Sequence, residues 1–215
     1  MSDGSYRLVS VTGKLFTQDG VGIDTTLLKL KKGKWIAETT KGLDYALKFK
    51  SDSTRRYYPR KNNNKEYIEI GAPQYLDKGK WKDLPIKTPI IEKSKLYFKQ
   101  KDYTLEHLVT PDGAKVNLIL NNKSFNKPIR WPISFHNLTK KAETLISKHD
   151  GKTVAFFAPP RWNDAKELTG SISYTVKDGY LTYDSPNLTG AVYPVTIDPT
   201  LNIGVAAGAD DYDYS

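Results

Sequence analysis

The side chains that could carry chemistry in this 215-residue chain are few and widely spaced. The chain has no cysteine and three histidines, which are His107, His136 and His149. No two of these histidines lie two or four residues apart, so the common zinc-binding spacings are absent. Without cysteine, thiolate nucleophiles, disulfides and cysteine-ligated metals are excluded. We therefore expect His107, on a strand, to be structural and His149 to be a solvated residue of a turn.

Other catalytic classes also lack a signal. The chain contains no Gly-x-Ser-x-Gly motif and no glycine-rich phosphate loop at the start of a helix. Glu66 and Glu69 fall on opposite faces of one strand and cannot form a glycosidase pair with each other. The acidic stretch 210–213 lacks the spacing of a calcium loop. The sequence thus predicts a protein that is not an enzyme, with no catalytic, cofactor-binding or metal-binding residue.

The elements that would position any site are strands, because apolar residues alternate with a period of two along the chain. Glycine, asparagine and proline separate the short runs, which favours an all-β fold built as an antiparallel β-sandwich or sandwiches with little helix. The expected strands cover residues 7–12, 26–30, 34–38, 45–49, 66–70, 95–98, 103–109, 115–120, 129–133, 153–157, 171–176 and 180–183.

Turn signals at 18–20, 32–34 and 177–179 predict hairpins between neighbouring strands. Only residues 138–146 show helical spacing, through Leu138, Ala142 and Leu145, so one short helix is expected there. Same-face positions in the alternating runs predict the core. Its expected members are Leu8, Val11, Trp35, Ile68, Ile70, Leu118, Leu120, Trp131, Ile133, Phe156, Ile172, Val195 and Ile197.

A polar stretch at 57–65 breaks the composition and suggests an organisation into three parts. These are an N-terminal β region at 1–55, a β-sandwich domain at 56–200, and a tail or the start of a following module at 201–215. No apolar run reaches 18 residues, and the polar start lacks a secretory signal, so we expect neither a membrane span nor export through such a signal.

Positive charge is concentrated in the first half. Residues 1–101 carry 22 Lys and Arg against 11 Asp and Glu, whereas residues 102–215 carry 11 against 13. The basic half could face an acidic protein, an anionic glycan or nucleic acid, or could be a lysine-coated β surface. Lysine supplies 18 of the 22 cations, which makes specific nucleic-acid recognition the less favoured reading. The candidate contact surface comprises Lys29, Lys31, Lys32, Lys34, Arg55, Arg56, Tyr57, Tyr58, Arg60 and Lys61.

Aromatic residues near lysines allow a second interpretation. Tyr57, Tyr58, Tyr75 and Trp81 could stack on sugar rings or bases, although alternation favours a core position for most of them. Contact with glycan therefore stays open. No cofactor is expected.

Two sets of segments resemble known proteins. Residues 157–165 (FAPPRWNDA) and 193–200 (YPVTIDPT) resemble a module of Rhs-like and wall-associated surface proteins, in which the second phrase closes a β domain. Residues 67–75, 81–85 and 129–134 resemble phrases in structural proteins of tailed bacteriophages. The resemblance covers about residues 55–200.

These resemblances imply function by contact. The preferred reading is a structural protein of a virion, in a head decoration, tail or fibre, which binds other virion proteins and forms a homo-oligomer or lattice contact. The alternative is a glycan-contacting module of a cell-surface or Rhs-type protein, and a glycan-cleaving tail enzyme comes last. The lack of a signal peptide and of cysteine favours the virion over the cell surface.

Overall fold

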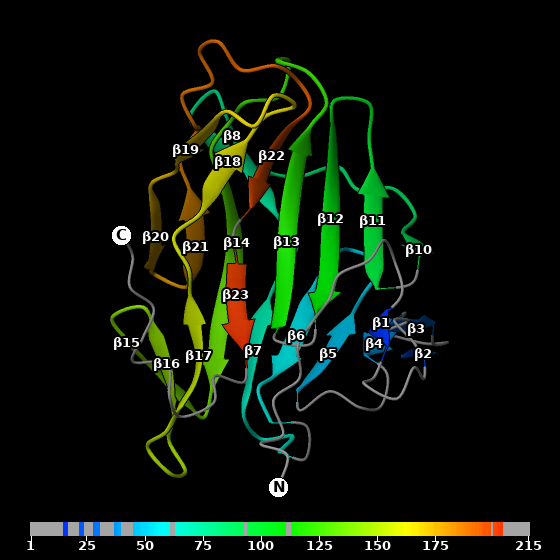
Figure 1. Cartoon of the computed structure of the whole chain (residues 1–215). Helices are drawn as coiled ribbons and strands as arrows, with labels where there is room; N and C mark the ends of the chain where they lie inside the picture. Colours follow the sequence, from blue (N-terminus) through cyan, green and yellow to red (C-terminus); the bar gives the residue numbers. More distant parts are fainter. Residues whose placement is uncertain are drawn as a thin grey trace, which may run out of the picture.

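A computed structural model describes residues 15–16, 22–23, 28–30, 37–39, 45–60, 63–92, 94–110, 113–198 and 200–203. Every regular element in these ranges is a β-strand, which confirms the all-β prediction. All the strand pairings are antiparallel. Figure 1 shows two large layers of strands, one behind the other, which is the arrangement of a β-sandwich.

The first sheet is the front layer of Figure 1. It follows the order β10-β11-β12-β13-β23-β17-β16-β15, and β22, β18 and β19 extend it beside β13. Its strands are β10 (Ile90–Glu92), β11 (Lys95–Lys99), β12 (Tyr103–Thr110), β13 (Gly113–Leu120), β15 (Leu138–Lys141), β16 (Thr144–Ser147), β17 (Thr153–Phe157), β18 (Arg161–Asn163), β19 (Thr169–Ser171), β22 (Val195–Asp198) and β23 (Thr200–Ile203).

The second sheet lies behind it and follows the order β20-β21-β14-β7-β6-β5-β4-β3, with β8 and β9 attached to β14. A separate pair joins β1 (Leu15–Phe16) to β2 (Gly22–Ile23). The strands of the second sheet are β3 (Leu28–Leu30), β4 (Ala37–Thr39), β5 (Ala46–Phe49), β6 (Arg55–Tyr58), β7 (Tyr67–Ile70), β8 (Gln74–Asp77), β9 (Lys80–Asp83), β14 (Ile129–His136), β20 (Tyr174–Lys177) and β21 (Tyr180–Tyr183).

One continuous core joins the two sheets, because alternate residues of each strand face inward. Nine of the expected core residues are buried, namely Ile68, Ile70, Leu118, Leu120, Trp131, Ile133, Ile172, Val195 and Ile197. Phe156 is half-buried instead, and its neighbour Phe157 is buried, in a strand whose register with β16 shifts at Leu145. Leu8, Val11 and Trp35 lie outside the described residues.

The prediction of a short helix at residues 138–146 is wrong. This segment forms a hairpin of β15 and β16, in which Lys141 pairs with Thr144. Leu138 and Leu145 are buried, as they would have been on one face of a helix. The chain reverses at Ala142, whose φ of 49° is left-handed, so the turn forms without the glycine or asparagine that usually marks one.

The hairpin expected at 177–179 is confirmed between β20 and β21, where Asp178 and Gly179 both have positive φ. The turns expected at 18–20 and 32–34 lie outside the described residues, although the flanking strands pair. The expected boundary after residue 55 falls inside β6, which pairs with both β5 and β7. The boundary after residue 200 falls inside β23, so strands on both sides of each boundary share a sheet.

Candidate functional site

The ten residues of the candidate contact surface do not lie together: some are buried, some are half-exposed, and the rest fall outside what the structure describes. Arg55, Tyr57 and Tyr58 are buried, which corrects the expectation that they meet a partner. They lie on β6, an inner strand of the second sheet, and Arg55 Nε donates a hydrogen bond to Tyr57 Oη at 2.9 Å inside the sandwich. Arg56 and Arg60 remain half-exposed. Lys31, Lys32, Lys34 and Lys61, and the side chain of Lys29 on β3, lie outside what the structure describes.

A serine and a histidine meet in the core beside Arg55. Ser53 Oγ lies 2.9 Å from His107 Nε2, and Ser53 has a left-handed φ of 66°. Hydroxyl and imidazole groups at this distance form nucleophile and base pairs in some enzymes. Here both residues are sealed from solvent, and the rings of Phe49 and Phe98 pack against the imidazole. Burial, together with the charge of Arg55, holds the pKa of His107 well below its usual range, so the imidazole is neutral.

The outward face of the second sheet carries a first cluster of cation and aromatic groups. The Arg56 guanidinium lies 4.3 Å from the centre of the Tyr67 ring, and its Nε donates to Glu69 Oε2 at 2.9 Å. The Tyr67 ring in turn stacks on the His136 imidazole at 4.0 Å. Ser134 Oγ is 3.1 Å from His136 Nε2. Three neighbouring strands, β6, β7 and β14, therefore present one ordered row of side chains.

A second cluster lies farther along β14 on the same face. Arg130 is held between two rings, 4.3 Å from the centre of Trp81 and 3.9 Å from that of Tyr180, and its Nε donates to Gln74 Oε1 at 2.9 Å. Arg130 and His136 are six residues apart on β14, and because side chains alternate along a strand, both lie on the same face of the sheet. The distance between them along the strand is about 20 Å. Trp81 and Tyr180 are half-exposed. Of the four aromatics considered for stacking, Tyr57 and Tyr58 are buried, whereas Tyr75 and Trp81 are half-exposed.

Tyr75 lies on β8 opposite Ile129 of β14 and packs against the core, on the other side of the sheet from Arg130 and Gln74. Its ring packs on Phe125 at 5.7 Å and under the Lys127 ammonium at 5.0 Å. Lys127 and Lys82 both donate to Asp77, which lowers the pKa of that carboxyl to about 2. The Asp77 carboxylate therefore pairs with two lysines.

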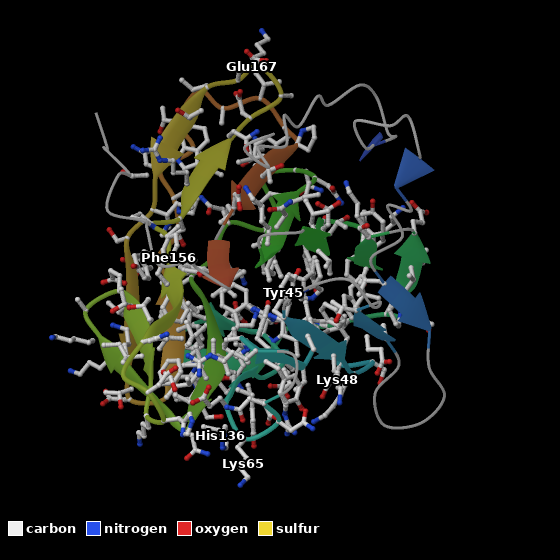
Figure 2. All side chains as sticks on the ribbon, turned by 60° about the horizontal axis from the view of Figure 1, so that its bottom comes forward. Tyr45, Lys48, Lys65, His136, Phe156 and Glu167 are labelled. Carbon is white, nitrogen blue, oxygen red and sulfur yellow. The ribbon has the colours of Figure 1, made fainter. Side chains whose placement is uncertain are left out.

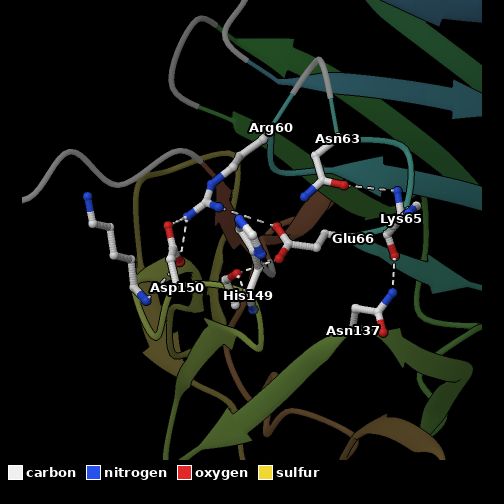
Figure 3. A network of polar contacts seen from close by, with 9 residues as sticks. Arg60, Asn63, Lys65, Glu66, Asn137, His149 and Asp150 are labelled. Carbon is white, nitrogen blue, oxygen red and sulfur yellow. Dashed lines mark hydrogen bonds and ion pairs between the residues drawn. The ribbon is translucent and has the colours of Figure 1, made fainter.

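A polar pocket opens where three connections between strands meet. It has a volume of about 650 Å³ and lies at the ends of β7, β14 and β16 (Figure 3). Figure 2 shows His136 and Lys65 near the same edge of the molecule, and Lys65 is one of the residues that line the pocket. The lining residues are Asn63, Asn64, Lys65, Glu66, Asn137, Lys148 and His149.

Hydrogen bonds tie the three connections of the pocket together. Arg60 donates from Nη2 to both oxygens of Asp150, at 2.8 and 3.0 Å, and this lowers the pKa of Asp150 to about 2. Asn137 Nδ2 donates to the carbonyl of Lys65 at 2.9 Å. Glu66 is buried and accepts a hydrogen bond from the hydroxyl of Ser147. Sequence reasoning missed this site, because its residues are scattered over about 90 positions of the chain.

Comparisons with known proteins give no relative, since no family model, curated protein or solved structure matches the chain. Within the described residues, no group of three or more histidines, aspartates or glutamates could hold a metal ion. The same part of the chain contains no helix long and apolar enough to cross a membrane.

Proposed function

We propose that this protein is a non-enzymatic structural component of a virus particle of the tailed-phage kind, and that it acts through protein contacts. The proposal combines the resemblance of residues 67–75, 81–85 and 129–134 to phage structural proteins with the chemistry of one molecular face. Its place would be the virion, in a head decoration, tail or fibre. Its partners would be other virion proteins or further copies of the chain.

The observation that carries the proposal is the pair of arginine and aromatic clusters on the outward face of the second sheet. Arginine, tyrosine and tryptophan are the residues most enriched at the energetic centres of protein interfaces. Arg130 is already held by Trp81, Tyr180 and Gln74, so little side-chain freedom is left to lose when a partner binds. We name this surface, made by Arg56, Tyr67, His136, Arg130, Trp81 and Tyr180, the β14 face.

The charge of the chain supports an acidic partner. The net charge is +9, and the excess lies in residues 1–101. Opposite charges on two partners speed their association and fix its orientation, while packed aromatic groups supply affinity that salt does not screen. Contact with nucleic acid would be non-specific and would weaken steeply as salt increases.

Two measurements test the proposal. Mass spectrometry of purified particles should detect the chain at a fixed ratio to the major shell protein. Light scattering over a concentration series should show that the isolated chain associates, alone or with that shell protein, at moderate salt. A monomer that is absent from particles and binds no particle protein would contradict the proposed function.

A further inference from the structure

We propose that the polar pocket of Figure 3 binds an acidic sugar residue of a glycan. The pocket is separate from the β14 face, and the inference goes beyond the proposed structural role and does not depend on it. It follows from the size of the pocket, its charges, its unused hydrogen-bonding groups and the rigidity of its walls.

The size of the pocket suits a small ligand, and its polar lining residues favour a hydrophilic one. Its volume of about 650 Å³ lies within the range of small-ligand sites, about 300 to 1,000 Å³. Its lining consists of amides, cations, one carboxylate and one imidazole, and includes no aliphatic or tyrosine, phenylalanine or tryptophan side chain. A ligand rich in hydroxyl groups matches such walls, whereas an apolar ligand would leave the polar groups unsatisfied.

The charges of the pocket favour an acidic ligand. Lys65 and Lys148 are exposed, and neither ammonium forms an ion pair with any residue that the structure describes. Arg60 lies between two carboxylates, with Nη1 3.6 Å from Glu66 Oε2 and Nη2 2.8 Å from Asp150 Oδ2. Three cations, Arg60, Lys65 and Lys148, therefore lie near two carboxylates, Glu66 and Asp150. A carboxylate or sulfate on a sugar would neutralise the excess positive charge.

The hydrogen-bonding groups of the pocket complement ring hydroxyls. Glu66 uses one oxygen for Ser147, and its other oxygen, Oε2, is buried and accepts no hydrogen bond. Asn137 donates from Nδ2 to the Lys65 carbonyl, which leaves its side-chain oxygen as an acceptor. Asn63 accepts from the Lys65 N–H through Oδ1, so its NH₂ group is free to donate. Hydroxyl groups can satisfy donors and acceptors together, since each both donates and accepts.

The walls are held in place before any ligand binds. The Arg60 and Asp150 pair joins the β6–β7 connection to the β16–β17 connection. Asn137 joins the β14–β15 connection to the β6–β7 connection, and the Lys148 N–H donates to the Asn137 carbonyl at 3.0 Å. A site whose lining residues are already held by hydrogen bonds loses less conformational entropy on binding.

A nucleotide fits this pocket less well. Base recognition uses an open aromatic face for stacking, and the nearby Tyr67 and His136 rings stack on each other. Free phosphate would engage the two lysines, but it offers fewer hydroxyl donors to the acceptor groups of Glu66 and Asn137 than a sugar ring does. An acidic sugar is the chemistry that engages both kinds of group.

Titration of the ¹⁵N-labelled full chain, followed by backbone amide shifts, tests the inference. The probes are three acidic tetrasaccharides, made of galacturonate, of sulfated heparin units and of sialic acid, together with neutral maltotetraose and inorganic phosphate. We expect at least one acidic tetrasaccharide to shift the amides of residues 63–66, 137 and 148–149, and to bind at least about tenfold more tightly than maltotetraose or phosphate.

Two double variants distinguish binding in the pocket from non-specific attraction to the positive charge of the chain. Lys65→Gln with Lys148→Gln should weaken binding by at least about tenfold. Lys87→Gln with Lys123→Gln removes the same charge from two other exposed positions and should change binding by less than about twofold. The inference is overturned if no acidic tetrasaccharide binds, if maltotetraose or phosphate binds as tightly, or if the two double variants behave alike.

Discussion

The Asp164 carboxylate accepts the backbone N–H of Val192 at 2.7 Å and thereby ties the turn after β18 to the segment that leads into β22. Its other oxygen accepts the N–H groups of Lys166 and Leu168. Trp162 of β18 pairs with Ile197 of β22, and its indole lies so close to Gly170 that a side chain there would overlap it. The two phrases that resemble Rhs-like proteins are therefore neighbours in one sheet.

Replacing Asp164 should loosen this connection. Asp164→Ala leaves three backbone N–H groups without their acceptor and should lower the melting temperature, and Asp164→Asn, which keeps one oxygen, should lower it less. The hydrogen bonds to backbone N–H groups, of which that from Val192 has the largest effect, lower the pKa of Asp164. Its contribution to stability is therefore present above pH 4 and is lost as the pH falls further. Thermal unfolding should show no comparable loss for Asp184→Ala, whose carboxylate is exposed. Equal melting temperatures for all four proteins would contradict this role.

His107 should make stability depend on pH below neutrality. Its pKa is lowered in the fold by burial, so the unfolded chain takes up the proton first, near pH 6.5, and stability falls as the pH drops below that value. The slope should reach up to about 1.4 kcal/mol per pH unit. Asp77 and Asp150, with pKa values of about 2, lose their contributions only below pH 4, which leaves pH 5 to 7 for the histidine.

Urea unfolding between pH 5 and 8 measures this dependence. His107→Gln, which can still hydrogen-bond Ser53, should be less stable at pH 8 but should lose the steep decline below pH 6.5. His149→Gln alters an exposed side chain and should retain the decline. A wild-type protein equally stable at pH 5 and pH 8 would show that His107 does not remain neutral in the fold.

Ala142→Gly should stabilise the protein. Ala142 has a φ of 49°, which is unfavourable for a residue with a Cβ and free of strain for glycine. We expect a gain of about 0.5 to 1 kcal/mol in the free energy of unfolding. Ala165→Gly, at an exposed position without a positive φ, should give no gain. Denaturant titration compares the two, and a loss of stability in Ala142→Gly would be contrary to the turn described.

The alternating pattern of the sequence predicted the strands well where it is long and uninterrupted, as in β12, β13 and β14. It failed at β15 and β16, because lysine, alanine and glutamate favour helices and because the turn at Ala142 carries no glycine or asparagine. Leu138 and Leu145 would have faced the core in a helix as well as in the β15–β16 hairpin. The pairing of β16 with β17 favours the hairpin, and this contact cannot be read from the local sequence.

The site was less predictable than the fold. Arg55 was expected in the contact surface because it belongs to the basic half of the chain, but here Tyr57 accepts its hydrogen bond in the core. Trp81 and Tyr180 are nearly 100 residues apart in the chain, and the Arg130 guanidinium contacts both rings. The pocket around Glu66 likewise depends on contacts between distant loops, which no local pattern of residue types reveals.

Removing the aromatic groups of the β14 face should impair association more than folding. Trp81→Ala with Tyr180→Ala should weaken self-association or binding to the shell protein by at least about 30-fold. The free energy of unfolding should fall by less than about 2 kcal/mol, because both rings are half-exposed and contact Arg130. Tyr97→Ala, on β11 of the first sheet, serves as the control and should leave association intact. Light scattering and denaturant titration on the three proteins measure both effects.

Hydroxyl-radical footprinting of the chain, free and within purified particles, tests most directly the claim that the β14 face is a contact surface. The extent of oxidation at each aromatic residue reports how much of its side chain solvent reaches. We predict that Trp81, Tyr180 and Tyr67 become at least about threefold less oxidised in the particle, while Tyr97 changes little. Equal oxidation of these three residues in the free and assembled states, or protection confined to Tyr97, would contradict the claim.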